Sequence, residues 1–276
     1  MKLVLFSKGL QDHDVAALIE RGHELGVDGY DLAVRPGYVV SPDNVTEMLP
    51  AAVRRLGEAG LVVPLVTAST DLVSPEHPTA KPIIAAMGKA GVPLLKLGYF
   101  RFDPRTQDYW EEVDKARRAL DGWQELGRAH GVKVCCHTHS GPYLGNNGAA
   151  LMHLLRGRDP QLIGAYLDPA HLALEGGPFA VELNMARRYL SLVALKDPIR
   201  FREDHGDEGG LGREIVEAGQ GMVRWSEVLA ELARVGYRGP FSVHGEFKAP
   251  DQPIYLAACK REVAYFRAKL GAAFPA

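Results

Sequence analysis

The chain alternates short apolar runs with amphipathic stretches, and one junction between them recurs. A helical stretch ends in a glycine, and an apolar run follows at once; these runs end at Tyr30, Pro64, Leu95, Cys135 and Phe241. Glycine suits the left-handed residue that follows the C-terminus of a helix. The runs are short and rich in Val and Leu, as buried parallel strands are. The pattern therefore predicts strands that alternate with helices.

Three further apolar runs complete the pattern, at Leu3–Ser7, Leu162–Asp168 and Leu192–Lys196, and a long amphipathic stretch covers about Thr106–His130. Strands that alternate with helices indicate an α/β protein with a parallel sheet. Eight such units in 276 residues predict a (β/α)8 TIM barrel, as a single domain over residues 1–276. An open doubly wound sheet is the alternative, and the lack of a Gly-rich dinucleotide motif after the first strand weighs against it.

Two segments stand outside this repeat. Phe201–Gly221 is polar and Gly-rich and follows the seventh strand, so we expect a long lid or binding loop there. The predicted last helix, about Pro253–Leu270, carries an apolar stripe. We expect the stripe to close the barrel wall, although it also leaves a homo-oligomer open. Its members are Tyr255, Leu256, Val263, Tyr265 and Phe266.

Composition narrows the setting. The net charge is −2, whereas nucleic-acid-binding proteins usually carry an excess of positive charge. No apolar stretch approaches the length of a membrane span, and the N-terminal run is interrupted by Ser7 and Lys8, so it predicts a first strand and not a signal peptide. The three cysteines form no disulfide framework or paired metal motif. We therefore expect a cytoplasmic protein with no nucleic-acid or membrane partner.

Residues that carry chemistry gather where the predicted strands end, which is where a barrel places its active site. Side chains alternate along a strand, so His137 and His139 share a face, as do His244 and Glu246. Imidazoles and carboxylates that converge on one axis can bind a divalent metal or transfer protons. The other strand-end residues are Asp31, Arg35, Lys96, Asp168, His171, Lys196 and Asp197.

Each of these residues also has a purely structural explanation. A strand-end histidine is often a hydrogen-bonded core residue, Asp168 before Pro169 can start a turn, and Asp31 can pair with Arg35. Titratable groups at the ends of four successive strands nevertheless favour a functional site.

In their order along the chain, several motifs resemble the sugar phosphate isomerase/epimerase superfamily, the xylose isomerase-like barrels. The motifs are "GVDGYDL", "GVKVCCHTHSG", "DPAH", "LKD" and "YRGPFSV", and they span essentially the whole chain. A narrower likeness, in "DLAVRPG" and "DPAHLALEGG", is to members linked to oxidised (3-keto) sugars. The resemblance implies a small-molecule sugar substrate.

The resemblance also implies a divalent metal, but its usual ligands are replaced. The family takes Glu, Asp, His and Glu from strands five to eight, and the matching residues are His137, Asp168, Ala194 and His244. In one interpretation His137, Asp168 and His244 form a rebuilt shell for Mn, Zn, Fe or Co. In the other, no metal is bound, and the histidines and Lys196 polarise the carbonyl and move protons.

The expected chemistry is proton abstraction beside the carbonyl of a keto sugar or a related polyol-derived ketone, which makes the protein an isomerase or epimerase. Glu246 or His139 is the candidate base, and Lys196 the candidate carbonyl polariser. The resemblance implies that His171 and Arg200 contact the substrate. We expect Lys96, Asp31 and Arg35 to line the substrate site as well.

Three other functions are alternatives to an isomerase or epimerase. A dehydratase, another carbon–oxygen lyase or a hydratase acting on a (3-)keto sugar or an inosose is the close alternative, because the strand-eight Glu is missing and "HTHSG" resembles inosose dehydratases. The ligand replacements also leave open a non-catalytic sugar-binding barrel. A DNA-repair nuclease, which the superfamily includes, needs a basic groove that the net charge of −2 argues against.

Overall fold

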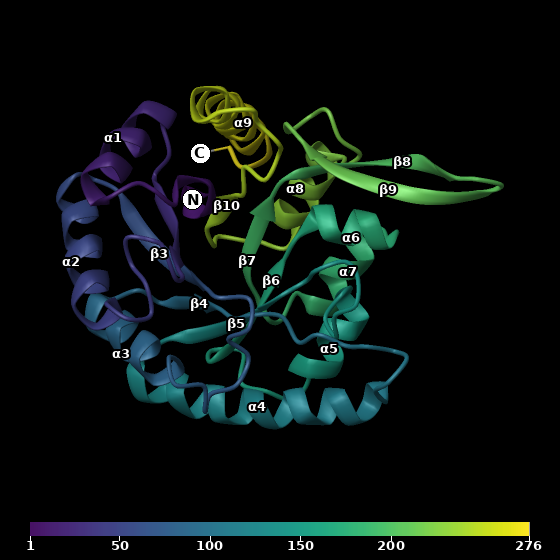
Figure 1. Cartoon of the computed structure of the whole chain (residues 1–276), viewed down its shortest axis with the longest axis horizontal. Coiled ribbons are helices and arrows are strands. Elements are labelled where there is room, and N and C mark those ends of the chain that lie inside the picture. Colours follow the sequence, from purple (N-terminus) through teal and green to yellow (C-terminus); the bar gives the residue numbers. More distant parts are fainter. Residues whose placement is uncertain (276) are drawn as a thin grey trace.

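The computed structural model describes residues 1–275 and closes the predicted strands into a ring. The barrel strands are β1 (Leu3–Phe6), β2 (Gly29–Val34), β3 (Val62–Ala68), β4 (Leu94–Lys96), β5 (Lys133–His137), β6 (Ile163–Leu167), β7 (Leu190–Leu195) and β10 (Phe241–Val243). They lie in the order β1-β10-β7-β6-β5-β4-β3-β2, and every neighbouring pair is parallel. Figure 1 shows helices around the outside of this ring. The prediction of a (β/α)8 TIM barrel is confirmed.

The helices are α1 (Val15–Leu25), α2 (Val45–Glu58), α3 (Ala80–Ala90), α4 (Tyr109–His130), α5 (Gly148–Leu155), α6 (Pro169–Glu175), α7 (Phe179–Ala186), α8 (Trp225–Arg234) and α9 (Gln252–Ala273), with a 3-10 turn η1 at Ser7–Leu10. The junction glycines of the sequence pattern all have positive φ, as the end of a helix requires: Gly26, Gly60, Gly91, Gly131 and Gly236. Within residues 1–275, no helix is both long and apolar enough to cross a bilayer.

Two apolar layers hold the barrel together. The interior is filled by Val4, Leu65, Cys135, Tyr166, Leu192 and Ala194. A larger core lies between the strands and the surrounding helices, and α9 contributes buried Tyr255, Val263 and Phe266 to it. The expectation that the apolar stripe of this helix closes the barrel wall is therefore confirmed. Because the interior is filled with side chains, the space for a ligand lies at the strand ends.

The segment expected to be a long loop is instead a β-hairpin. Strand β8 (Asp197–His205) pairs antiparallel with β9 (Glu208–Val216), and Gly206 and Asp207 form the turn between them. Figure 1 shows the hairpin projecting from the barrel beyond β7. The loop prediction was wrong because polarity alone does not exclude a strand. An exposed arm still pairs its backbone groups, and a two-residue turn that contains Gly permits this pairing.

Candidate active site

Lys196 follows β7 and lies at the centre of the strand ends. Its Nζ is 2.7 Å from Glu246 Oε2, 2.9 Å from His171 Nε2 and 3.1 Å from Asp168 Oδ2. The side chain is 4% exposed. Burial alone would lower the pKa of Lys196, but the carboxylates of Asp168 and Glu246 raise it above its usual value. The site therefore holds a permanent positive charge.

A chain of hydrogen bonds fixes the neutral form of His171. The Lys196 ammonium can only donate, so His171 Nε2 accepts, and the proton lies on Nδ1, which contacts Ser140 Oγ at 2.8 Å. Arg213, from β9, donates to the same hydroxyl at 2.6 Å. Burial and the charge of Lys196 hold the pKa of His171 well below its usual value. The hairpin is thus tied directly to the centre of the site.

His139 lines the cavity and has one ring nitrogen without a hydrogen-bond partner among the described residues. Its Nδ1 lies 2.9 Å from the Ser140 carbonyl oxygen, and because a carbonyl only accepts, Nδ1 carries the proton. Nε2 is then unprotonated. Burial and Lys196 lower the pKa of His139 to about 4, so the ring is neutral at physiological pH. A positioned neutral imidazole of this kind can accept a proton.

A second buried chain runs beneath the cavity. Tyr166 OH lies 2.9 Å from His244 Nε2 and 3.4 Å from Asp31 Oδ2. Thr67 and Ser242 also donate to Asp31, at 2.6 and 2.9 Å. Asp31 is 0% exposed, and burial raises its pKa. This carboxyl group therefore anchors the floor of the site.

The donor set does not fit a divalent metal. Among residues 1–275, no three His, Cys, Asp or Glu side chains form a group able to hold one. His137 Nε2 and Asp168 Oδ2 are 3.4 Å apart and lack hydrogen-bond partners, but the Lys196 ammonium is 3.1 Å from that same oxygen. A metal bound to this oxygen at about 2 Å would lie close to a fixed positive charge. His244 Nε2 faces Tyr166, while its Nδ1 has no hydrogen-bond partner; the shell of His137, Asp168 and His244 stays a prediction that this arrangement does not favour.

Six of the predicted residues line one cavity of about 180 Å³. Asp31 does not line it, and Arg200 is exposed on β8, directly opposite Arg213 in the hairpin register. None of Asp31, Arg200 and His171 lines this cavity, and their predicted contacts with the substrate stay predictions. The cavity is lined by Phe6, Lys8, Arg35, Thr67, Thr70, Lys96, Tyr99, Arg101, His139, Tyr143, Tyr166, Lys196, His244 and Glu246. His171 and Asp168 support Lys196 from behind this lining.

Several residues of the site were not predicted from the sequence. Tyr166 lies two residues before Asp168 on β6, so strand alternation could have placed both on the inner face. Ser140 follows His139 directly. Arg213 could not be found, because the segment that carries it was predicted to be a loop. Lys8, which forms an ion pair with Glu246 Oε1 at 2.7 Å, was seen only as a break in the first apolar run.

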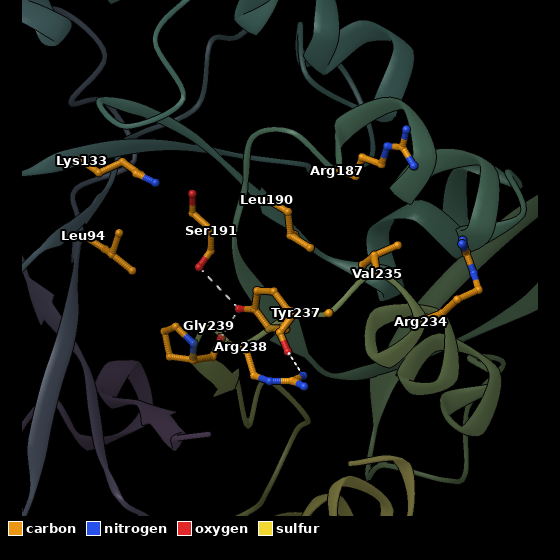
Figure 2. A pocket seen from close by; sticks show the side chains of 12 residues that line it. Leu94, Lys133, Arg187, Leu190, Ser191, Arg234, Val235, Tyr237, Arg238 and Gly239 are labelled. Carbon is orange, nitrogen blue, oxygen red and sulfur yellow. Dashed lines mark hydrogen bonds between the residues drawn. The ribbon is translucent and has the colours of Figure 1, made fainter.

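A larger cavity, of about 580 Å³, is lined by residues at the opposite ends of the strands. Figure 2 shows the basic side chains Lys133, Arg187, Arg234 and Arg238 around it. Arg234 pairs with Glu231, and Arg238 donates to the Tyr237 carbonyl. This cavity lacks the convergent acids, imidazoles and Lys196 of the other end, so we place the candidate active site at the smaller cavity.

Comparison with known proteins identifies the family. The model of the xylose isomerase-like TIM barrel family matches residues 19–261, and the chain belongs to this family. The inosose dehydratase of Lactiplantibacillus plantarum is 26% identical over 148 residues, which cover 51% of this chain and 48% of that protein. The chain thus spans about half the length of this curated relative.

Solved structures share the whole fold. The D-psicose 3-epimerase of Clostridium cellulolyticum superposes with a TM-score of 0.76 at 18% identity, over 98% of this chain and 99% of that one. The probable 3-DHS dehydratase of Bacillus anthracis superposes with a TM-score of 0.71 at 15% identity, over 97% and 99% of the two chains. At such low identity these likenesses establish the barrel and not the reaction.

Proposed function

We propose that this protein is an isomerase or epimerase that abstracts a proton beside the carbonyl of a keto sugar, with Lys196 as the cation that stabilises the enediolate. The observation that carries the proposal is the contact of Lys196 Nζ with Glu246, His171 and Asp168. Lys196 also lines the cavity, so its ammonium can face a substrate oxygen there, while Asp168 Oδ2 at 3.1 Å pairs with it without a hydrogen bond. A fixed charge that faces a developing oxyanion is a large source of catalysis.

His139 and Glu246 are the proposed proton carriers. His139 Nε2 is a free acceptor at the cavity wall, and Glu246 lies on the segment after β10, separated from β5 by β6 and β7 in the barrel order. Burial would raise the pKa of Glu246, but Lys196 lowers it well below its usual value, so it is ionised. Either group can remove the proton and become its acid, and return of that proton to the neighbouring carbon gives the isomer. Return to the same carbon from the opposite wall, which is epimerisation, requires that the second group has first taken up a proton from solvent.

The related proteins support this class of reaction without choosing within it. Epimerases and dehydratases both occur among them. A dehydratase is therefore the second candidate, since loss of a β-hydroxyl follows the same proton abstraction. We also propose a cytoplasmic location, because Cys135, Cys136 and Cys259 are buried and free, as a reducing compartment allows.

The proposal is tested by incubating the protein with a panel of keto sugars in deuterated water and following the products by NMR. An isomerase or epimerase places deuterium on the carbon beside the carbonyl and keeps the mass otherwise unchanged. A product that has lost water identifies the dehydratase. Binding of a sugar without exchange or turnover leaves a non-catalytic barrel and refutes the proposal.

A further inference from the structure

The candidate active site carries basic side chains that have no carboxylate partner. Lys196 and Lys8 both pair with Glu246. Lys96, Arg35 and Arg101 line the same cavity, and within residues 1–275 none of them forms an ion pair. The charges of Arg35 and Arg101 are therefore not neutralised by an acidic group of the cavity, and Lys96 adds a further basic group.

Lys96 is the most unusual of the three. It is 2% exposed, its Nζ lies 3.6 Å from the centre of the Tyr99 ring, and this nitrogen has no hydrogen-bond partner. Burial and the nearby charge of Arg35 hold the pKa of Lys96 well below its usual value. A buried amine without an acceptor is destabilising. An anion in the cavity would supply the missing acceptor and stabilise the charged ammonium.

Arg35 has donors to spare. Its Nε donates to the Ala68 carbonyl at 3.1 Å, and the guanidinium lies 5.2 Å from the centre of the Phe6 ring. Guanidinium has four further N–H groups and matches the two oxygens of a carboxylate or phosphate. Arg101 is exposed at the cavity mouth, 5.8 Å from the Tyr143 ring, where it adds to the attraction for an approaching anion.

We propose that the substrate carries an anionic group, a carboxylate or a phosphate ester, which binds to Lys96 and Arg35 while its ketone faces Lys196. This inference rests on the proposed function and narrows its substrates from keto sugars to their acids or phosphates. The cavity of about 180 Å³ is smaller than most drug-sized ligand sites, so the substrate is small.

The test is calorimetric titration of the whole protein with matched pairs of ligands. L-Sorbose is compared with 5-keto-D-gluconate, and D-ribulose with D-ribulose 5-phosphate. We expect an anionic member to bind at least about tenfold more tightly than its neutral partner, since a hydrogen bond to a charged group contributes about 1.5–3 kcal/mol. The carboxylate and phosphate arms separate the two sources of charge. Lys96→Met and Arg35→Gln should each remove the preference.

Lys133→Met is the matched control, because it removes one positive charge from the other basic cavity, shown in Figure 2. It should leave the anion preference intact; loss of the preference in this variant alone would place the anion at the wrong end of the barrel. Thermal melts check that the variants fold, and Arg35→Gln, at a half-buried position, suffices if Lys96→Met does not.

The remaining outcomes separate this inference from the proposed function. Equal binding of neutral and anionic partners overturns the anionic substrate, and turnover of the neutral sugar would then leave the proposed function standing. Preferential binding of an anion without turnover would support the anionic ligand and refute the proposed isomerase or epimerase activity.

Discussion

Lys196 Nζ lies 2.7 Å from Glu246 Oε2, and this contact joins the end of β7 to the segment after β10. The same ammonium reaches Asp168 and His171 on the side of β6. One side chain therefore connects three segments of the barrel and provides the positive charge around which the proposed chemistry is arranged.

Lys196→Met should reduce turnover at least about a hundredfold, the usual effect of removing a donor from a developing oxyanion. It should also reduce the free energy of unfolding by about 3–5 kcal/mol, because it leaves Asp168 buried and unpaired. Lys8→Met is the comparison, since it removes the other cation on Glu246 but at a side chain that is 48% exposed. Lys8→Met should reduce the free energy of unfolding by only about 0–1 kcal/mol. Equal losses of stability in the two variants, measured by denaturant unfolding, would contradict this description of Lys196.

The pH profile tests His139. Because the pKa of His139 is lowered to about 4, kcat/KM should remain level as the pH falls from neutral and should decline only as it approaches about 4. An acid limb centred near about 6.5, the ordinary value for histidine, would remove His139 from the role of base. His139→Gln should reduce turnover about a hundredfold or more. Circular dichroism at each pH separates this effect from unfolding.

The hairpin offers an internal comparison between two arginines that face each other in its register. Both side chains are exposed, but Arg213 donates to Ser140 at 2.6 Å, whereas the Arg200 side chain forms no hydrogen bond or ion pair within residues 1–275. Arg213→Gln should lower kcat about tenfold or more, because it releases the Ser140–His171 chain behind Lys196. Arg200→Gln should have little effect. Similar losses of kcat in both variants would mean that the hairpin acts through its overall charge and not through this bond.

Glu262 makes stability depend on pH. It lies on α9, is 1% exposed, and burial, with smaller contributions from Asp197 and Glu217, raises its pKa to about 8. The folded protein therefore keeps this proton where the unfolded chain releases it. The contribution of protonated Glu262 to the stability of the fold should be fully present below pH about 4.5 and should be lost as the pH rises through about 8.

Glu262→Gln removes this ionisation while keeping the shape of the side chain. We expect the variant to be more stable than the native protein at pH about 8. Its stability should fall much less as the pH rises. The difference should narrow towards pH about 5. A parallel decline of the melting temperature in both proteins would show that another group is responsible.

The sequence predicted the barrel because its signals are local. The glycine after each helix and the apolar run that follows repeat five times, and both depend only on neighbouring residues. Strand ends then indicated where Asp168, Lys196 and Glu246 would lie, because parallel strands in a barrel end on one face.

The contacts within the site and the hairpin could not be predicted, because they depend on how separate strands pair, and a local sequence pattern does not determine this. That Lys196 Nζ lies beside Asp168 follows from the way in which β6 and β7 pair, with a register shift at Ala165 and Tyr166. The hairpin was missed because its signal is a Gly-Asp turn inside a polar segment. Arg213 was missed with it, as was the distinction between Arg213 and Arg200.

The most direct test of the account is turnover by protein whose metal content has been measured after treatment with a chelator. The ketose that the substrate panel identifies is incubated with this protein in deuterated water. We predict that metal-depleted protein places deuterium beside the carbonyl at the full rate, and that Lys196→Met does not. Exchange that disappears on depletion and returns only when Mn, Zn, Fe or Co is added would contradict Lys196 as the cation of the site.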